Sequence, residues 1–156
     1  MRFFEAVQDV YFDDLDAFRV LHNARYVLLF ERTIGAFWRR LGWGSALAAE
    51  ENPDQFHLVR SNHIEYLRPV VGTGQVRVRA SVARIGRTSL TFDLRCLAMD
   101  EDTDHATGTR VIVRVDPQTR KPVPWSASFR ERLSPYTSAA GDPTPLPAPT
   151  EAPSAG

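Results

Sequence analysis

The sequence predicts an α+β fold in which an antiparallel β-sheet is covered by one long α-helix. Between residues 23 and 41 the apolar side chains recur at three- and four-residue spacings, the period of a helix. Farther along the chain apolar and polar side chains alternate in four segments, the period of half-buried strands. These strands follow one another with short connections, so antiparallel pairing is the simplest arrangement. The helix is the only large element available to cover the apolar face of such a sheet.

The first strand is expected over residues 4–12 and is followed by an acidic turn and then the helix. Asn23 stands at the start of the helix and is a good N-cap candidate. The apolar positions of the helix are Val27, Phe30, Ile34, Phe37, Trp38 and Leu41. Gly42 and Gly44 are expected to end it in a left-handed turn. A short second helix is expected over residues 45–51, capped by its first residue, Ser45.

The remaining elements are strands and one short helix. The strand at residues 58–67 runs into Pro69, whose missing N–H is tolerated only at a sheet edge or a strand end. Three further strands are indicated by alternation at residues 76–82, 90–96 and 110–115. A short amphipathic helix is expected around residues 126–133. We therefore expect one folded domain over residues 1–133.

Residues 134–156 have the composition of a tail. Six of the 11 prolines lie in this stretch, among alanine, serine, threonine and glycine. Such a segment cannot bury enough apolar surface to offset the entropy lost on ordering. We expect it to be a disordered C-terminal extension.

The overall composition excludes several classes of partner and site. The 19 basic and 19 acidic residues cancel, which gives no support for a nucleic-acid or membrane-surface partner. No stretch approaches the roughly 18 consecutive apolar residues of a membrane span, and the first residues do not form a signal peptide. A cytoplasmic location is the default expectation. Cys96 is the only cysteine, and its place in a strand-like run favours a buried, inert thiol.

Three carboxylates stand within four residues just before the helix, at Asp13, Asp14 and Asp16. On composition alone this cluster is a polar turn that leads into a helix start. The order of the residues around it favours a site instead.

That order resembles the 4-hydroxybenzoyl-CoA thioesterase family of hot-dog proteins. The family pattern is Asp-x-Asp, a short loop and then Asn-Ala-x-Tyr at the start of a long helix. Asp14 and Asp16 match the first part, and residues 23–26, Asn-Ala-Arg-Tyr, match the second at the usual spacing. Weaker matches follow in the right order at residues 63–69 (His-Ile-Glu-Tyr-Leu-Arg-Pro), 86–90 (Gly-Arg-Thr-Ser-Leu) and 113–116 (Val-Arg-Val-Asp), then at Pro122. The resemblance covers about residues 2–133.

The resemblance implies a hot-dog fold, an antiparallel sheet wrapped around the helix, and hydrolysis of an acyl-CoA thioester to a free acid and coenzyme A. Asp16 would be the catalytic carboxylate, either as a nucleophile or as a general base. The residue seven positions later supplies an oxyanion-binding backbone N–H in the family, and here it is Asn23. In another branch of hot-dog thioesterases a carboxylate on the helix is catalytic, which makes Glu31 the alternative. An ordinary structural hydrogen bond explains Glu31 equally well.

The loop departs from the family pattern at two positions. Arg19 stands where glycine is usual, so glycine-only backbone angles are costly there, and Val20 holds the family's histidine position. His22, two residues later, is a candidate to orient a water or the thioester, although a structural role is as common at a helix start. Tyr26 is a candidate for the acyl pocket, although aromatic residues on a helix are more often core. Arg60, Arg87 and Ser89 are candidates to contact the coenzyme A phosphates, although solvated surface is the commoner role for each.

The resemblance also implies partners. Hot-dog domains pair edge to edge as dimers, often within tetramers, and their active sites lie at the interface. No cofactor is expected beyond the coenzyme A of the substrate. His57 and His63 are the only paired candidates for metal ligands, but at strand rise they stand roughly 20 Å apart, so no metal site is assigned.

Three other readings stay open. An acyl-carrier-protein thioester is the closest alternative substrate. A hot-dog hydratase or dehydratase would use a His–Asp or His–Glu pair, which the Asp-x-Asp loop does not resemble. A non-catalytic acyl-binding module is favoured by Arg19 and Val20.

Overall fold

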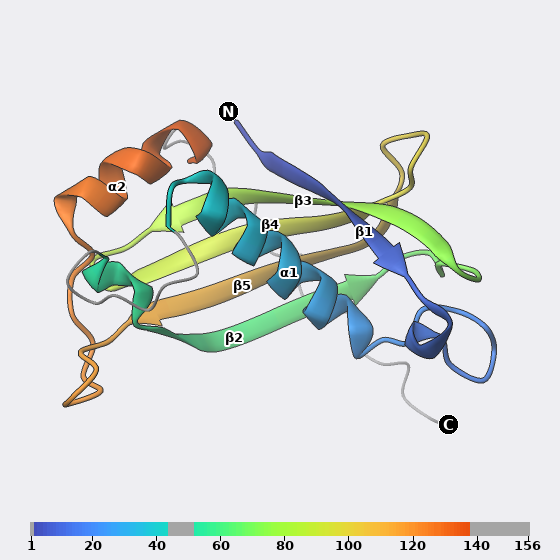
Figure 1. Ribbon diagram of the computed structural model, residues 1–156, viewed down its shortest axis with the longest axis horizontal. Coiled ribbons are helices and arrows are strands. Elements are labelled where there is room, and N and C mark those ends of the chain that lie inside the picture. The colour runs from blue at the N-terminus through green and yellow to red at the C-terminus, as the bar shows by residue number, and fades with distance from the viewer. Residues whose placement is uncertain (1, 44–51, 138–156) are drawn as a thin grey trace, which may run out of the picture.

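The computed structural model describes residues 2–43 and 52–137, which form a five-stranded antiparallel sheet with α1 across one face (Figure 1). The elements are β1 (Phe4–Val10), α1 (Arg25–Arg40), β2 (His57–Tyr66), β3 (Gly74–Ile85), β4 (Ser89–Leu97), β5 (Asp104–Arg114) and α2 (Ala127–Leu133). The predicted α+β class, the antiparallel sheet and the helix that covers it are confirmed. The last strand, β5, begins six residues earlier than the alternation indicated.

The strands lie in the order β1-β3-β4-β5-β2. Two pairs of consecutive strands, β1 with β2 and β2 with β3, are therefore not adjacent. The reason is that β2 hydrogen-bonds to the outer side of β5, while β3 lies between β1 and β4. The seven residues from Leu67 to Thr73 carry the chain past the ends of β5 and β4. β1 and β2 are the two edges of the sheet, and Pro69 lies three residues beyond the end of the edge strand β2.

The core lies between α1 and the inner face of the sheet. The buried side chains of the helix include Leu29, Phe30, Ile34 and Phe37, and the facing residues of β3 are Val76, Val78, Ala80 and Val82. Burying a side chain of this size stabilises a fold by about 1.5–3 kcal/mol. The helix approaches β5 closely at Gly108, where a Cβ would lie 2.7 Å from the His63 carbonyl oxygen and 3.2 Å from the Phe30 ring.

The ends of α1 differ slightly from the prediction. The N-cap is Ala24 rather than Asn23, and no side chain caps it. The chain enters the helix through a turn, in which the Arg25 N–H donates to the His22 carbonyl at 2.8 Å. At the other end Gly42 has φ +88°, which confirms the expected left-handed stop. Gly44 and the predicted helix at residues 45–51 lie outside the described residues.

The C-terminal part of the domain continues past the predicted boundary at residue 133. The expected short helix is present as α2, and the Ser126 hydroxyl caps it by accepting the Phe129 N–H at 3.2 Å. A 3₁₀ turn follows at Ser134–Tyr136, and the Tyr136 ring packs on Phe37 with 4.8 Å between centroids. Residues 138–156 of the predicted tail lie outside the described residues. None of the described helices is long and apolar enough to span a membrane.

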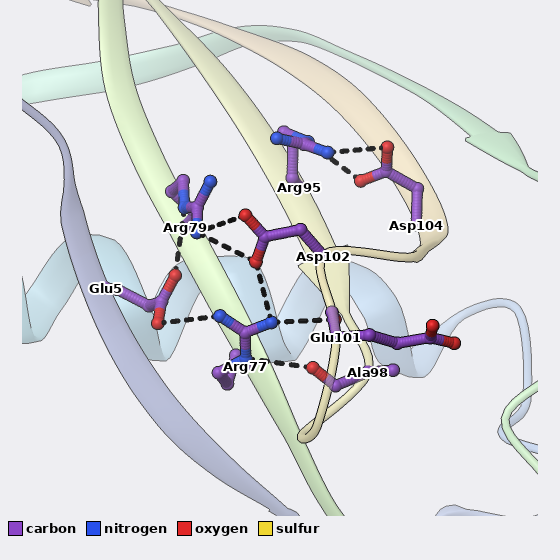
Figure 2. A network of polar contacts seen from close by, with 8 residues as sticks. All are labelled: Glu5, Arg77, Arg79, Arg95, Ala98, Glu101, Asp102 and Asp104. Carbon is purple, nitrogen blue, oxygen red and sulfur yellow. Dashed lines mark hydrogen bonds and ion pairs between the residues drawn. The ribbon is translucent and has the colours of Figure 1, made fainter. Parts of the chain in front are cut away.

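The outer face of the sheet carries a network of ion pairs (Figure 2). Arg77 and Arg79 of β3 both contact Glu5 on β1 and Asp102 in the β4–β5 turn. Arg77 also donates to the Ala98 carbonyl at 2.8 Å. The hydrogen bond from Arg77 to the Asp102 carboxylate is the main cause that lowers the pKa of this carboxyl. The network therefore fastens the β4–β5 turn to β3 and, through Glu5, to the edge strand β1.

Candidate active site

A pocket of about 480 Å³ opens where the loop before α1 meets the end of β2. Its lining comes from three segments: the loop, the first turn of α1 and the end of β2. The residues are Asp16, Val20, Leu21, Asn23, Tyr26, Tyr66, Leu67, Arg68 and Pro69. The structure therefore brings Asp16, Asn23 and Tyr26, all candidates from the sequence, to one cavity.

Asp16 is half-buried and held by its own loop. Its Oδ1 accepts the Phe18 N–H at 2.8 Å and the Val20 N–H at 3.4 Å. The Asp16 backbone N–H donates to the Val20 carbonyl at 2.9 Å. No hydrogen bond or ion pair within the described part of the chain uses Oδ2. One carboxylate oxygen is thus committed to orientation, and the other is available for chemistry.

Asp14, the other carboxylate of the Asp-x-Asp pair, has a structural role. It is buried, with 4% of its surface exposed. Its Oδ2 accepts the Tyr11 N–H at 2.8 Å, and its Oδ1 lies 3.6 Å from the Arg25 Nε. Asp14 therefore connects the end of β1 to the start of α1, while Asp16 faces the pocket.

Arg19 adopts the left-handed conformation, with φ +60°. The loop thus keeps a backbone angle that favours glycine, although an arginine occupies the position. Its carbonyl accepts the Gly72 N–H at 2.9 Å, and the Leu21 N–H donates to Val70 at 2.8 Å. These contacts to the segment after β2 hold the loop in this shape.

The backbone at Asn23 presents an available donor. The N–H groups on both sides are engaged: His22 donates to the Asp14 carbonyl at 2.9 Å, and Ala24 donates to the His22 Nδ1 at 3.1 Å. In the described structure no hydrogen bond uses the Asn23 N–H. It lies at the start of α1, where the helix dipole is positive. The His22 ring is absent from the pocket lining and acts here as an acceptor for the backbone.

Two tyrosines form the aromatic side of the pocket. Tyr26 is buried, which raises the pKa of its hydroxyl to about 12. The Tyr66 ring meets it edge to face, with 5.1 Å between centroids. The Tyr66 hydroxyl donates to the Asn23 carbonyl at 3.0 Å.

The pocket-lining residues at the end of β2 and directly after it were missed by reasoning from the sequence. Tyr66, Leu67 and Arg68 stand directly before Pro69. The match of residues 63–69 to the family pattern was a signal that could have found them.

Glu31 lies outside the pocket lining. Its carboxylate pairs with Arg110 of β5, whose side chain is 3% exposed, whereas that of Glu31 is 59% exposed. The Arg110 Nε also donates to the Asn62 Oδ1 at 2.7 Å. Glu31 therefore neutralises a buried guanidinium.

The three candidates for phosphate contacts are also outside the pocket lining. Arg60 is exposed on the edge strand β2. Arg87 and Ser89 lie at the β3–β4 turn, where Ser89 is paired with Val113, at the opposite end of the sheet from the pocket. Within one chain the structure does not bring these three residues to Asp16.

Comparisons with known proteins agree with this geometry. A family model described as "Thioesterase-like superfamily" matches residues 10–133. A protein of Bacillus subtilis, "Uncharacterized protein YsmA", is 28% identical over 132 residues, which cover 84% of each chain.

Solved structures share the fold. A Thermus thermophilus thioesterase complexed with coenzyme A and Zn is 26% identical, with a TM-score of 0.70, over 85% of this chain and 92% of that chain. A 1,4-dihydroxy-2-naphthoyl-CoA thioesterase from Synechocystis is 13% identical, with a TM-score of 0.74, over 85% of this chain and 96% of that chain.

Proposed function

The chain belongs to the thioesterase-like superfamily, and we propose that it hydrolyses an acyl-CoA thioester to a free carboxylic acid and coenzyme A. One observation carries the proposal. An available carboxylate oxygen of Asp16 and an available N–H of Asn23 belong to residues that line the same pocket. Attack on a thioester needs these two groups: one to initiate it and one to stabilise the oxyanion that forms.

In the nucleophilic route the Asp16 Oδ2 attacks the thioester carbonyl carbon. The carbonyl oxygen becomes an oxyanion, which the Asn23 N–H and the positive end of α1 stabilise. Collapse of this intermediate breaks the carbon–sulfur bond, releases the thiolate of coenzyme A and leaves a mixed anhydride on Asp16. Water then hydrolyses the anhydride and restores the carboxylate.

In the general-base route the Asp16 Oδ2 takes a proton from water, and the resulting hydroxide attacks the same carbonyl carbon. The oxyanion forms at the same place and uses the same N–H. Its collapse breaks the carbon–sulfur bond and releases the thiolate of coenzyme A, which takes up the proton that Asp16 removed from water. The two routes therefore share Asp16 and Asn23, and the hold on Oδ1 by the Phe18 and Val20 N–H groups serves both.

The assignment of coenzyme A rests on two similar structures, one complexed with coenzyme A and one a 1,4-dihydroxy-2-naphthoyl-CoA thioesterase. Acyl carrier protein presents the same thioester on a protein surface and is the alternative. Turnover of the same acyl group on the two carriers distinguishes them.

We also propose that the protein is a homodimer paired through β2, with the sheet wrapped around α1 in the full hot-dog arrangement. β2 is an edge strand, and Leu58, Val59, Tyr66 and Leu67 at this edge are each about half exposed. An unpaired edge strand of this length, with exposed apolar side chains at both ends, favours pairing with another strand. In an antiparallel pair the His57 end of one β2 lies beside the Tyr66 end of the other. Arg60 of one copy thereby approaches the pocket of the second copy. The molar mass measured by light scattering tests the dimer.

The experiment that tests the activity is thiol release from a panel of aromatic and aliphatic acyl-CoAs. Asp16→Asn is compared with Asp13→Asn, which neutralises an exposed aspartate in the same loop whose carboxylate makes no hydrogen bond or ion pair among the described residues. We expect turnover of at least one thioester, lost in the first variant and kept in the second. If no thioester in the panel releases thiol, the thioesterase proposal fails, and the non-catalytic alternative that Arg19 and Val20 favour is then tested by acyl-CoA binding.

A further inference from the structure

The two peptide units that flank the Asn23 Cα offer four polar groups, and three of them are engaged. The His22 carbonyl accepts the Arg25 N–H at 2.8 Å. The Ala24 N–H donates to the His22 Nδ1 at 3.1 Å. The Asn23 carbonyl accepts the Tyr66 hydroxyl at 3.0 Å. The fourth group, the Asn23 N–H, makes no hydrogen bond among the described residues.

The hydrogen bonds of the three engaged groups restrict the direction of the fourth group, the Asn23 N–H. Each peptide unit is planar, so a carbonyl held in place also fixes the N–H of the same unit. The unit between His22 and Asn23 is held only through its carbonyl, by the first turn of the helix. The unit between Asn23 and Ala24 makes two hydrogen bonds, one from its N–H to the His22 ring and one to its carbonyl from the Tyr66 hydroxyl. Only the bond from Tyr66 comes from another element of the fold.

Tyr66 reaches this contact from the edge of the sheet, with 52% of its surface exposed. It is the last residue of β2, and its register partner on β5 is Ala106. Its ring packs edge to face on Tyr26, which is only 3% exposed. The side chain therefore reaches Asn23, 43 residues away in sequence, from a ring held by the sheet and by the helix.

The start of α1 has no ordinary side-chain cap. A helix start commonly uses a Ser, Thr, Asp or Asn side chain to accept one of the free N–H groups. Here the N-cap is Ala24, which has no such side chain. The Tyr66 hydroxyl restrains the backbone by donating to the Asn23 carbonyl, and the Asn23 N–H stays available.

We propose that Tyr66 is a positioning residue for the oxyanion donor: its hydroxyl holds the peptide unit that follows the Asn23 Cα and thereby restricts rotation about the Asn23 backbone, so that the free N–H of the preceding unit stays directed at the thioester oxygen. The role rests on the proposed thioesterase function. Tyr66 lines the pocket as well, but its hydroxyl hydrogen is committed to the Asn23 carbonyl. Its effect is on the orientation of the donor and therefore on the transition state more than on substrate binding.

The test is the variant Tyr66→Phe, which removes the hydroxyl and keeps the ring on Tyr26. One neutral hydrogen bond corresponds to about tenfold in rate, so we expect kcat to fall about tenfold and KM to change by less than about twofold. The control is Tyr11→Phe, which removes the hydroxyl of an exposed tyrosine outside the pocket lining and should leave both constants unchanged. An unchanged kcat in Tyr66→Phe, or a rise in KM alone, overturns the proposal.

A second measurement needs no turnover. Hydrogen exchange of the Ala24 amide, followed by NMR, reports how firmly the peptide unit after Asn23 is held. We expect Tyr66→Phe to speed this exchange several-fold while the amides of β5 keep their wild-type rates. If the wild-type protein hydrolyses no thioester, the proposed function fails, and the exchange result still decides whether Tyr66 fixes this peptide. Unchanged Ala24 exchange in Tyr66→Phe contradicts the positioning role.

Discussion

Arg110 on β5 forms an ion pair with Glu31 on α1. Glu31, the alternative catalytic carboxylate of the sequence analysis, therefore has a structural role. The guanidinium is almost fully buried, and it also donates to Asn62 on β2 and to the Val27 carbonyl at 3.5 Å. One arginine thereby joins the helix, the central sheet and the edge strand.

Glu31→Gln tests this assignment against a catalytic one. The amide can still accept from Arg110 but carries no charge, so we expect the free energy of unfolding to fall by about 1 kcal/mol. We expect kcat to stay within about threefold of wild type. Urea unfolding and steady-state kinetics check both values, and Glu131→Gln on α2 is the exposed control. A hundredfold loss of kcat with unchanged stability would identify Glu31 as the catalytic carboxylate.

The left-handed backbone at Arg19 gives a second prediction. A side chain in this conformation costs roughly 1–2 kcal/mol relative to ordinary angles, and glycine escapes that cost but loses more entropy on folding. We expect Arg19→Gly to raise the free energy of unfolding by up to about 1 kcal/mol. Arg19→Val should lower it by about the same amount, because β-branched residues tolerate positive φ least. Equal stability of the Gly and Val variants would contradict the observed angle.

The ion pairs around Asp102 predict a dependence of stability on pH. The hydrogen bond from Arg77 lowers the pKa of the Asp102 carboxyl in the folded state. The resulting stabilisation is therefore present above the ordinary aspartate pKa of about 3.9 and is lost as pH falls through the lower folded value. We expect Asp102→Asn to lower Tm at pH 7 and the difference from wild type to shrink as the buffer is acidified. Asp100→Asn, at an exposed site in the same turn, should show no such trend.

Cys96 gives a prediction that also concerns the assay. The side chain is fully buried on β4, and burial raises the pKa of its thiol to about 12. Because the thiolate is the reactive form, we expect a disulfide reagent such as DTNB to label the native protein over minutes only after urea is added. Fast labelling without denaturant would show that the thiol is accessible and would contradict the packing of β4 against α1.

Much of the fold follows from local patterns. Alternation placed the four strands after the helix, and the three- and four-residue spacing placed α1 to within two residues at its start. The order of the strands in the sheet could not be predicted from such local patterns. Nothing local to β2 says that it pairs with β5 rather than with β3, because that choice depends on how the whole sheet covers the helix.

The residues of the candidate site also differ in whether local sequence was sufficient to find them. Asp16, Asn23 and Tyr26 stand close together in the sequence, and the family pattern was sufficient to find them. Tyr66 reaches Asn23 from 43 residues away, and its contact depends on the path of the edge strand. The angle at Arg19 was expected to be costly for a residue with a side chain, and the structure shows that the loop adopts it through contacts with residues 70–72.

Asp16→Asn is the most direct test of the central assignment. The Asn Oδ1 can still accept the Phe18 and Val20 N–H groups, so the loop should keep its shape while the negative charge is lost. The measurement is kcat/KM for the best acyl-CoA substrate, alongside the unfolding curve of each variant. We predict a fall of a hundredfold or more with unchanged stability and wild-type activity in Asp13→Asn. Full activity in Asp16→Asn would contradict the account, because hydrolysis would then proceed without this carboxylate.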